Sequence, residues 1–166
     1  GQHNTINILF VDDDNTLGPW DGSEIHPYDT IQKAVDNASF GDTIFVKSGR
    51  YNGNVIIEKT IDLIGEDRFL VQIIGGKHDF WVHADDVLIK NFTIVNCSRY
   101  FSGIYISSSG CRIEHNIIKN NYAGVYLDGG SSNIVKDNVF LYNDDRSVRI
   151  EFSNANRVTN NYIGYG

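Results

Sequence analysis

A repeat of about 23 residues in the second half of the chain constrains the fold more than any other feature. Its anchor residues follow one another at nearly equal intervals, and they are Ile89, Ile113, Val135 and Val158. Short runs of alternating apolar and polar residues carry the repeat, and such runs are typical of β-strands. A period of this length built from strands indicates a β-solenoid, in which each repeat forms one coil.

The repeat favours a parallel β-helix over a leucine-rich repeat. The chain has only seven leucines, too few for the dense leucine pattern of that class. We therefore expect an all-β fold of five to six coils, with equivalent residues one strand spacing apart, roughly 4.8 Å. In this register Asn116, Asn138 and Asn161 form one column. We expect them to stack as an amide ladder at a corner of the solenoid.

The segment before the coils has the pattern of a short amphipathic helix. Asp29 and Gln32 form a capping-box pair, apolar residues follow at helical spacing, and Gly41 ends the run. This helix is expected to cover the first coil. We predict one domain over residues 1–166, with an N-terminal strand, an acidic loop and the helix in 1–42, and coils in 43–166. The last coil stops partway, which is expected either for an excerpt of a longer chain or for an end that a partner covers.

Composition excludes two kinds of partner. The net charge of −7 disfavours nucleic acid, which needs a basic face. No apolar run is long enough to span a membrane. Two cysteines, Cys97 and Cys111, are too few for a disulfide framework, and we expect both to be free thiols.

Several segments in the first part of the chain form a recognisable set, and they are 11–15, 18–22, 26–28, 31–32, 41–44, 49–51 and 61–65. This set resembles the opening of the right-handed parallel β-helix proteins of the pectin-lyase-like group, especially archaeal cell-surface members with Asn-rich repeats. The resemblance extends from about residue 9 to the end and is specific for the fold rather than the activity, because this fold supports lyases, hydrolases, epimerases and non-catalytic surface modules. It implies an extracellular location. Three N-glycosylation sequons, at Asn37, Asn91 and Asn96, are consistent with that location.

One outward column is the best candidate for binding a ligand. Tyr105, Tyr126 and Arg149 share it, and two positions further along each strand lie Ser107, Asp128 and Glu151. Aromatic rings beside two carboxylates and a cation could bind a sugar or an acidic polysaccharide. The same residues also fit a solvated face with stacked tyrosines and surface ion pairs. The candidate substrate-binding residues are Tyr105, Tyr126, Asp128, Arg149 and Glu151.

No complete catalytic set is visible, although some residues could serve. His115 and Asp137 lie in one column and could form an acid/base pair or an ordinary surface pair. No serine or cysteine nucleophile is expected beside them. The column of Lys90, Glu114 and Lys136 indicates a structural charge ladder. If the chain is catalytic, the candidate residues are Asp128, Glu151, Arg149, His115 and Asp137.

The acidic opening could hold a metal ion. Asp12, Asp14, Asp21 and Glu24 offer oxygen ligands that suit Ca²⁺, although their spacing is not that of an EF-hand. No cofactor is otherwise required. One periplasmic branch of the fold is associated with copper-enzyme maturation, but copper is not expected here. Methionine is absent and the five histidines are scattered at His3, His26, His78, His83 and His115.

Two functions remain open. We favour a non-catalytic extracellular structural module, such as a sheath, S-layer, filament or adhesin unit, which associates with itself or with neighbouring surface-protein domains through its open C-terminal coil. The alternative is a carbohydrate-binding or polysaccharide-cleaving β-helix module. A groove along one face would favour the alternative.

Overall fold

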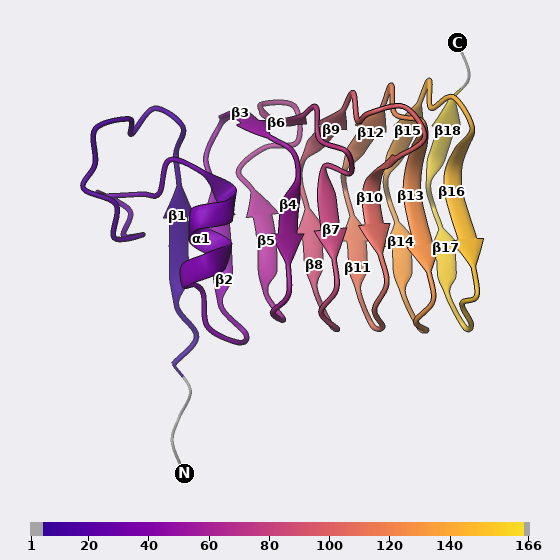
Figure 1. The fold of residues 1–166 in the computed structure, drawn as a ribbon, viewed down its shortest axis with the longest axis horizontal. Helices are drawn as coiled ribbons and strands as arrows, with labels where there is room; N and C mark the ends of the chain where they lie inside the picture. Colours follow the sequence, from indigo (N-terminus) through magenta and orange to yellow (C-terminus); the bar gives the residue numbers. More distant parts are fainter. Residues whose placement is uncertain (1–4, 165–166) are drawn as a thin grey trace.

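The computed structural model of the chain describes residues 5–164. The strands wind into a solenoid with three parallel sheets, and each full coil contributes one strand to each sheet. Figure 1 shows the strands stacked along the long axis, from β1 at one end to β16, β17 and β18 at the other. The expected parallel β-helix is therefore confirmed, with five full coils from β2 to β16.

The strands are short, and their bounds follow the repeat. The seven-stranded sheet comprises β1 (Ile8–Val11), β2 (Thr43–Val46), β5 (Asp62–Gly65), β8 (Leu88–Lys90), β11 (Arg112–Glu114), β14 (Ile134–Lys136) and β17 (Arg157–Thr159). The six-stranded sheet comprises β3 (Gly49–Asn52), β6 (Val71–Ile74), β9 (Thr93–Val95), β12 (Ile117–Lys119), β15 (Val139–Leu141) and β18 (Tyr162–Gly164). The five-stranded sheet comprises β4 (Val55–Ile57), β7 (Phe80–Val82), β10 (Ser102–Ile106), β13 (Ala123–Asp128) and β16 (Arg146–Glu151).

The register agrees with the predicted repeat. Ile113 pairs with Ile89 on one side and with Val135 on the other, and Val135 pairs with Val158. Inward side chains from all three sheets form one apolar core along the axis. The stack is therefore stabilised by burial of apolar columns, at roughly 25 cal/mol for each Å² removed from water.

The predicted asparagine ladder is present and is buried at a corner. Oδ1 of Asn138 accepts hydrogen bonds from the backbone N–H and from Nδ2 of Asn116, at 2.9 and 3.2 Å. Its Nδ2 donates to the carbonyl of Ile113 at 2.8 Å. Asn161 makes equivalent bonds to Asn138 one coil further on. Each amide thus satisfies backbone groups of the preceding coil where the chain turns between two sheets.

Two further ladders, which were not predicted from the sequence, lie at the other corners. Asn143 accepts from the N–H of Asn121, which in turn accepts from the N–H of Cys97. Asn156 accepts from the N–H of Asn133 in the same way. The asparagines of each ladder lie one repeat apart in the sequence, so the abundance of asparagine at the repeat spacing was the available signal.

The helix α1 (Ile31–Asn37) forms where predicted, but its cap differs. Thr30, rather than Asp29, is the N-cap, and its side chain accepts from the N–H of Lys33. Asp29 pairs instead with the ammonium group of Lys33 at 2.7 Å. Gln32 bonds to the backbone of Ile56 in β4 rather than to the cap. The hydrogen bonds of Gln32 to Ile56 tie the helix to the first coil, and they replace the capping-box bond that the sequence predicted.

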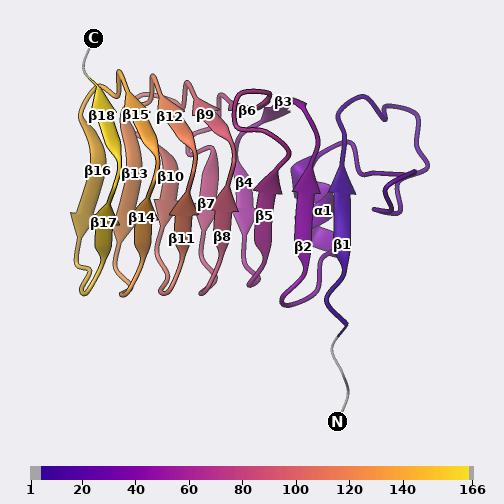
Figure 2. The same ribbon diagram turned by 180° about the vertical axis from the view of Figure 1, so that it is seen from behind.

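The helix covers the N-terminal side of the solenoid, as expected. Ile31, Ala34 and Val35 are buried in the common core. Figure 2 shows α1 beside β1 and β2, at the opposite end of the stack from β16 to β18. In residues 5–164 this seven-residue helix is far too short to cross a bilayer, and no other candidate span is found there.

We expect the substitution Asn138→Ala to destabilise the fold strongly. It leaves the buried N–H of Asn116 and the carbonyl of Ile113 without partners, at a cost of about 1–3 kcal/mol for each group. Asn52→Ala, at an exposed asparagine outside the ladders, should change the free energy of unfolding by less than about 0.5 kcal/mol. Urea denaturation of both variants measures the difference. Equal effects would show that the ladder contributes nothing specific.

Candidate functional site

The outer face of the five-stranded sheet is the candidate functional site. Its central column runs through Trp81, Tyr105, Tyr126 and Arg149, which pair in register across β7, β10, β13 and β16. We call these four residues the aromatic column. The predicted column began at Tyr105, and the structure extends it by Trp81 on the preceding coil.

The rings of the aromatic column follow one another at the spacing of the coils. The ring centroids of Trp81 and Tyr105 are 5.8 Å apart, and those of Tyr105 and Tyr126 are 5.4 Å apart in an edge-to-face arrangement. The guanidinium carbon of Arg149 lies 4.6 Å from the ring centroid of Tyr126, which is a cation–π contact. All four side chains are partly exposed, so the column presents a continuous aromatic strip to solvent.

Each tyrosine is anchored to a carboxylate of the next coil. The hydroxyl of Tyr105 donates to Oδ2 of Asp128, and that of Tyr126 donates to Oε2 of Glu151, both at 2.7 Å. Desolvation and these carboxylates raise the pKa of both tyrosines to about 12, so both remain neutral donors. The ring positions are therefore fixed before any ligand arrives.

A second column, which we call the acidic column, runs parallel to the first. It contains His83, Ser107, Asp128 and Glu151, and the register of β4 with β7 places Glu58 one coil before His83. Nδ1 of His83 lies 2.8 Å from Oγ of Ser107. Arg149 donates to Oε1 of Glu151 through Nε and Nη2, at 2.9 and 2.7 Å. The two columns together form a surface of rings edged by carboxylates.

A buried histidine closes one side of the aromatic column. The ring of His78 packs against Trp81, Tyr105 and Phe101, with centroid distances of 4.4, 4.8 and 5.0 Å. Its Nδ1 accepts from the N–H of Ser102, so Nε2 carries the proton. Burial lowers the pKa of His78 to about 4, which keeps the ring neutral.

Glu151 is poorly suited to act as a general acid. Hydrogen bonds from Tyr126 and Arg149 lower the pKa of Glu151, whereas a general acid needs a raised pKa. The other catalytic candidates, His115 and Asp137, lie on a corner away from this face, with 3.9 Å between Nε2 and Oδ2. Both have a positive φ, 55° and 57°, and Asn91 and Asn160 of the same column share it. A positive φ is adopted more readily by Asn, Asp and His than by most residues, so the backbone conformation at this corner accounts for the residue types in the column.

The predicted charge ladder is partly formed. Lys136 lies 3.6 Å from Glu114, and the register places Lys90 on the other side of that carboxylate. Arg112 contributes a further contact at 4.0 Å.

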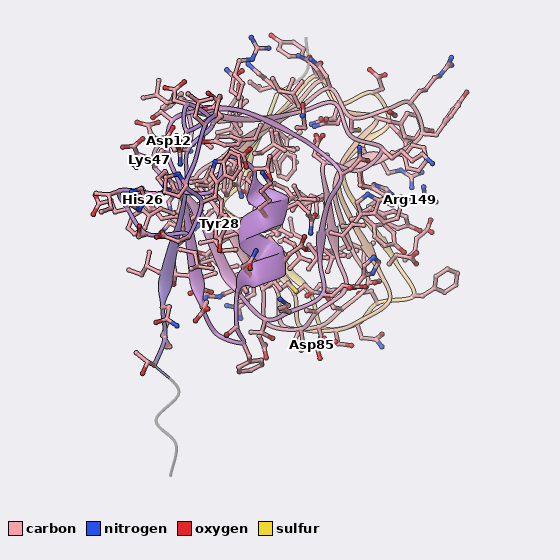
Figure 3. The ribbon with its side chains drawn as sticks, turned by 60° about the vertical axis from the view of Figure 1, so that its left-hand side comes forward. Asp12, His26, Tyr28, Lys47, Asp85 and Arg149 are labelled. Carbon is pink, nitrogen blue, oxygen red and sulfur yellow. The ribbon has the colours of Figure 1, made fainter. Side chains whose placement is uncertain are left out.

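The structure does not bring the four predicted calcium ligands together. Asp12 pairs with Lys47 at 3.5 Å, and Asp21 pairs with His26 at 3.4 Å. Within residues 5–164 no three His, Cys, Asp or Glu side chains are placed to hold a metal ion, and His3 lies outside these residues. Figure 3 shows Asp12, Lys47 and His26 on the side of the molecule opposite Arg149. Asp14 and Glu24 belong to the same N-terminal loop and are exposed. A calcium effect stays a prediction.

The sequons and thiols occupy different environments. Asn37 and Asn96 are exposed, whereas Asn91 is half-buried and Thr93 of its sequon is buried.

Both cysteines are free, as predicted, with Cys111 buried and Cys97 half-buried. Desolvation raises the pKa of Cys97 to about 11, so its thiol is unreactive at neutral pH.

A separate cavity of about 480 Å³ lies at the N-terminal cap. Its polar lining is largely engaged already, because Asp13 accepts from the N–H of Arg50 and Gln32 is bonded to Ile56. The aromatic face therefore remains the better candidate.

The fold and this face define a parallel β-helix module with an aromatic outer strip. Residues 35–165 match the family model of NosD, described as periplasmic copper-binding protein. The match covers most of the chain, so the chain belongs to the NosD family. No curated protein matches.

A solved structure with a similar fold is the pectin methylesterase from carrot. The TM-score is 0.70 at 14% sequence identity, over 95% of this chain and 52% of that one. The chain thus spans about half the length of the carrot enzyme. At this identity the likeness concerns the β-helix fold alone.

The residues described here do not fit a copper centre, despite the family's description. Copper favours clustered thiolate, thioether or imidazole donors. Sγ of Cys111 is buried beside Oγ of Ser108, and Nδ1 of both His78 and His83 is bonded to a serine. Among residues 5–164 no three His, Cys, Asp or Glu side chains are close enough together to hold a metal ion.

Asp79 and His78 should give the fold two opposing pH dependences. Asp79 is fully buried, its Oδ1 accepts from the N–H of Gly76, and its Oδ2 has no partner among the described residues. Burial raises its pKa from 3.8 to about 7, so folded Asp79 keeps a proton that the unfolded chain releases. The contribution of Asp79 to the free energy of unfolding therefore falls as the pH rises from about 4 to 7. Between about pH 4 and 6.5 the unfolded chain protonates His78 while the folded chain does not, so the contribution of His78 to the free energy of unfolding rises with pH over this range.

We therefore expect Asp79→Asn to raise the free energy of unfolding at pH 7.5 by on the order of 3 kcal/mol. At pH 4 its effect should nearly vanish. Urea denaturation at both pH values measures the difference, with Asp14→Asn, at an exposed aspartate, as the control. An Asp79→Asn effect that does not depend on pH would contradict this account.

Proposed function

We propose that this β-helix is a non-catalytic module that acts outside the cytoplasm and binds saccharide chains along its aromatic column. The observation that carries the proposal is the unbroken strip of Trp81, Tyr105 and Tyr126, with one ring on each successive coil. The periplasmic description of the family supports the location.

The chemistry of the face suits sugars. Aromatic rings offer flat apolar surfaces against which the C–H faces of sugar rings pack, while carboxylates at the edge accept hydrogen bonds from hydroxyl groups. Because Tyr105 and Tyr126 are held by Asp128 and Glu151, little conformational freedom is lost on binding. The coil spacing repeats the same contact, so a saccharide chain along the axis can meet several rings.

A non-catalytic role is supported by the protonation state and hydrogen bonds of Glu151. The lowered pKa of Glu151 leaves it without a proton to donate, and its oxygens are engaged by Tyr126 and Arg149. A rigid stack of coils that presents a binding strip fits a surface or spacer role. As part of this proposal, the module would act at the cell surface, like the archaeal and S-layer-associated β-helix proteins that its sequence resembles.

We expect the double substitution Trp81→Ala with Tyr126→Ala to weaken glycan binding at least tenfold, because two stacking surfaces are lost. Retention on immobilised polysaccharide gels measures the change. Phe69→Ala removes an exposed ring outside the face and should leave retention unchanged. Equal retention of the double variant and the parent chain would dismiss this face as the site.

Self-association is a second candidate, favoured by the apolar surface of the last coil. Ile150, Val158 and Ile163 are exposed there, and β17 is an edge strand at one end of the sheet that β1 ends at the other. The outer edge of β1 is already bonded to Gly22 and Tyr28, so a second copy would pair its own β17 with this one. Light scattering of the chain should then show a mass that grows with concentration, and Val158→Lys should abolish the growth. A monomer at every concentration would contradict this candidate.

A further inference from the structure

The fixed charges on the aromatic face bear on which glycans it can hold. Arg149 is the only cation in the aromatic and acidic columns, all of whose residues are described. Both its Nε and Nη2 donate to Glu151, and its guanidinium stacks on Tyr126. Two of its five N–H donors are therefore used by Glu151, whose carboxylate also offsets its charge, and this weakens its attraction for a carboxylate of a ligand.

The acidic column outweighs this cation. Glu58, Asp128 and Glu151 supply three carboxylates against the single guanidinium of Arg149. Asp128 and Glu151 are half-buried on neighbouring coils, whereas Glu58 is exposed three coils before Asp128 and one coil before Trp81. Each carboxylate is therefore near a chain that lies along the rings, where the Debye length is about 8–10 Å. An acidic polymer on the aromatic column would therefore meet an excess of like charge.

The carboxylates also leave an acceptor open. Asp128 uses Oδ2 to hold Tyr105, and its Oδ1 has no hydrogen-bond donor among the described residues. An open carboxylate oxygen beside an aromatic ring accepts a hydroxyl or an ammonium hydrogen, but repels a carboxylate.

We propose that this face takes a glycan without acidic groups, either neutral or amino-substituted, and rejects polyuronates. The proposal rests on the saccharide-binding function above and specifies the substrate class. Ring stacking supplies the contact with sugar faces, and the acidic column supplies the discrimination against negative charge.

Isothermal titration with three hexasaccharides of known charge tests the proposal. The probes are a neutral β-1,4-glucan hexamer, a chitosan hexamer with free amines and a galacturonate hexamer. We expect the first two to bind, and the galacturonate hexamer to bind at least tenfold more weakly at low salt. Added salt should narrow this difference, because exposed charges are screened.

The substitution Glu151→Gln provides the sharper test. It removes one negative charge and frees the guanidinium of Arg149, while the glutamine carbonyl can still accept from Tyr126. Binding of the galacturonate hexamer should then strengthen at least tenfold. Asp62→Asn makes the same change in net charge on the seven-stranded sheet, and should leave the preference among the three probes unchanged.

The outcomes separate this proposal from the proposed function. Galacturonate binding by the parent chain as strong as neutral-glucan binding overturns the charge preference but keeps the saccharide site. So does an equal gain from Glu151→Gln and Asp62→Asn, because the effect would then come from net charge alone. Failure of all three probes to bind, or binding that survives loss of Trp81 and Tyr126, overturns the saccharide-binding function itself.

Discussion

The asparagine ladders at the corners are the interaction on which the rest of this structure depends. A parallel β-helix must turn three times in every coil, and at each turn the backbone leaves the sheet that satisfied its hydrogen bonds. Asn116, Asn138 and Asn161 supply the missing partners at one corner, and shorter ladders do so at the other two. Because each amide bonds to the coil before it, the ladders also hold successive coils in register, and every outward column inherits that register.

The aromatic face is a direct consequence of this register. Trp81, Tyr105, Tyr126 and Arg149 are each about one repeat apart in the sequence, yet they lie on adjacent strands. The tyrosine hydroxyls reach diagonally to the carboxylates of the next coil, so the two columns stabilise each other. A surface that repeats at the coil spacing is suited to a repeating ligand, which is the physical basis of the proposed saccharide site.

Membership of the NosD family and the chemistry of the face address different questions. The family match assigns the chain by its sequence pattern, and the likeness to the carrot enzyme concerns the fold. Neither determines what the outer side chains bind, because the inward columns form the core that stabilises the fold, whereas the outward columns face solvent. The clustered aromatic rings are the basis of the proposed saccharide site, whereas no three His, Cys, Asp or Glu side chains of residues 5–164 are placed to hold a metal ion.

The sequence by itself determined the repeat, the parallel coils, the first asparagine ladder and the core of the aromatic column, because residues one period apart become neighbours in a solenoid. It did not reveal that Thr30 caps the helix or that Gln32 bonds to Ile56 of β4. Nor did it reveal the packing of His78 against Phe101, or the bond of Tyr105 to Asp128. Those contacts depend on side-chain torsions and on how each corner folds, and only the tertiary structure decides them because the column spacing contains no information on either.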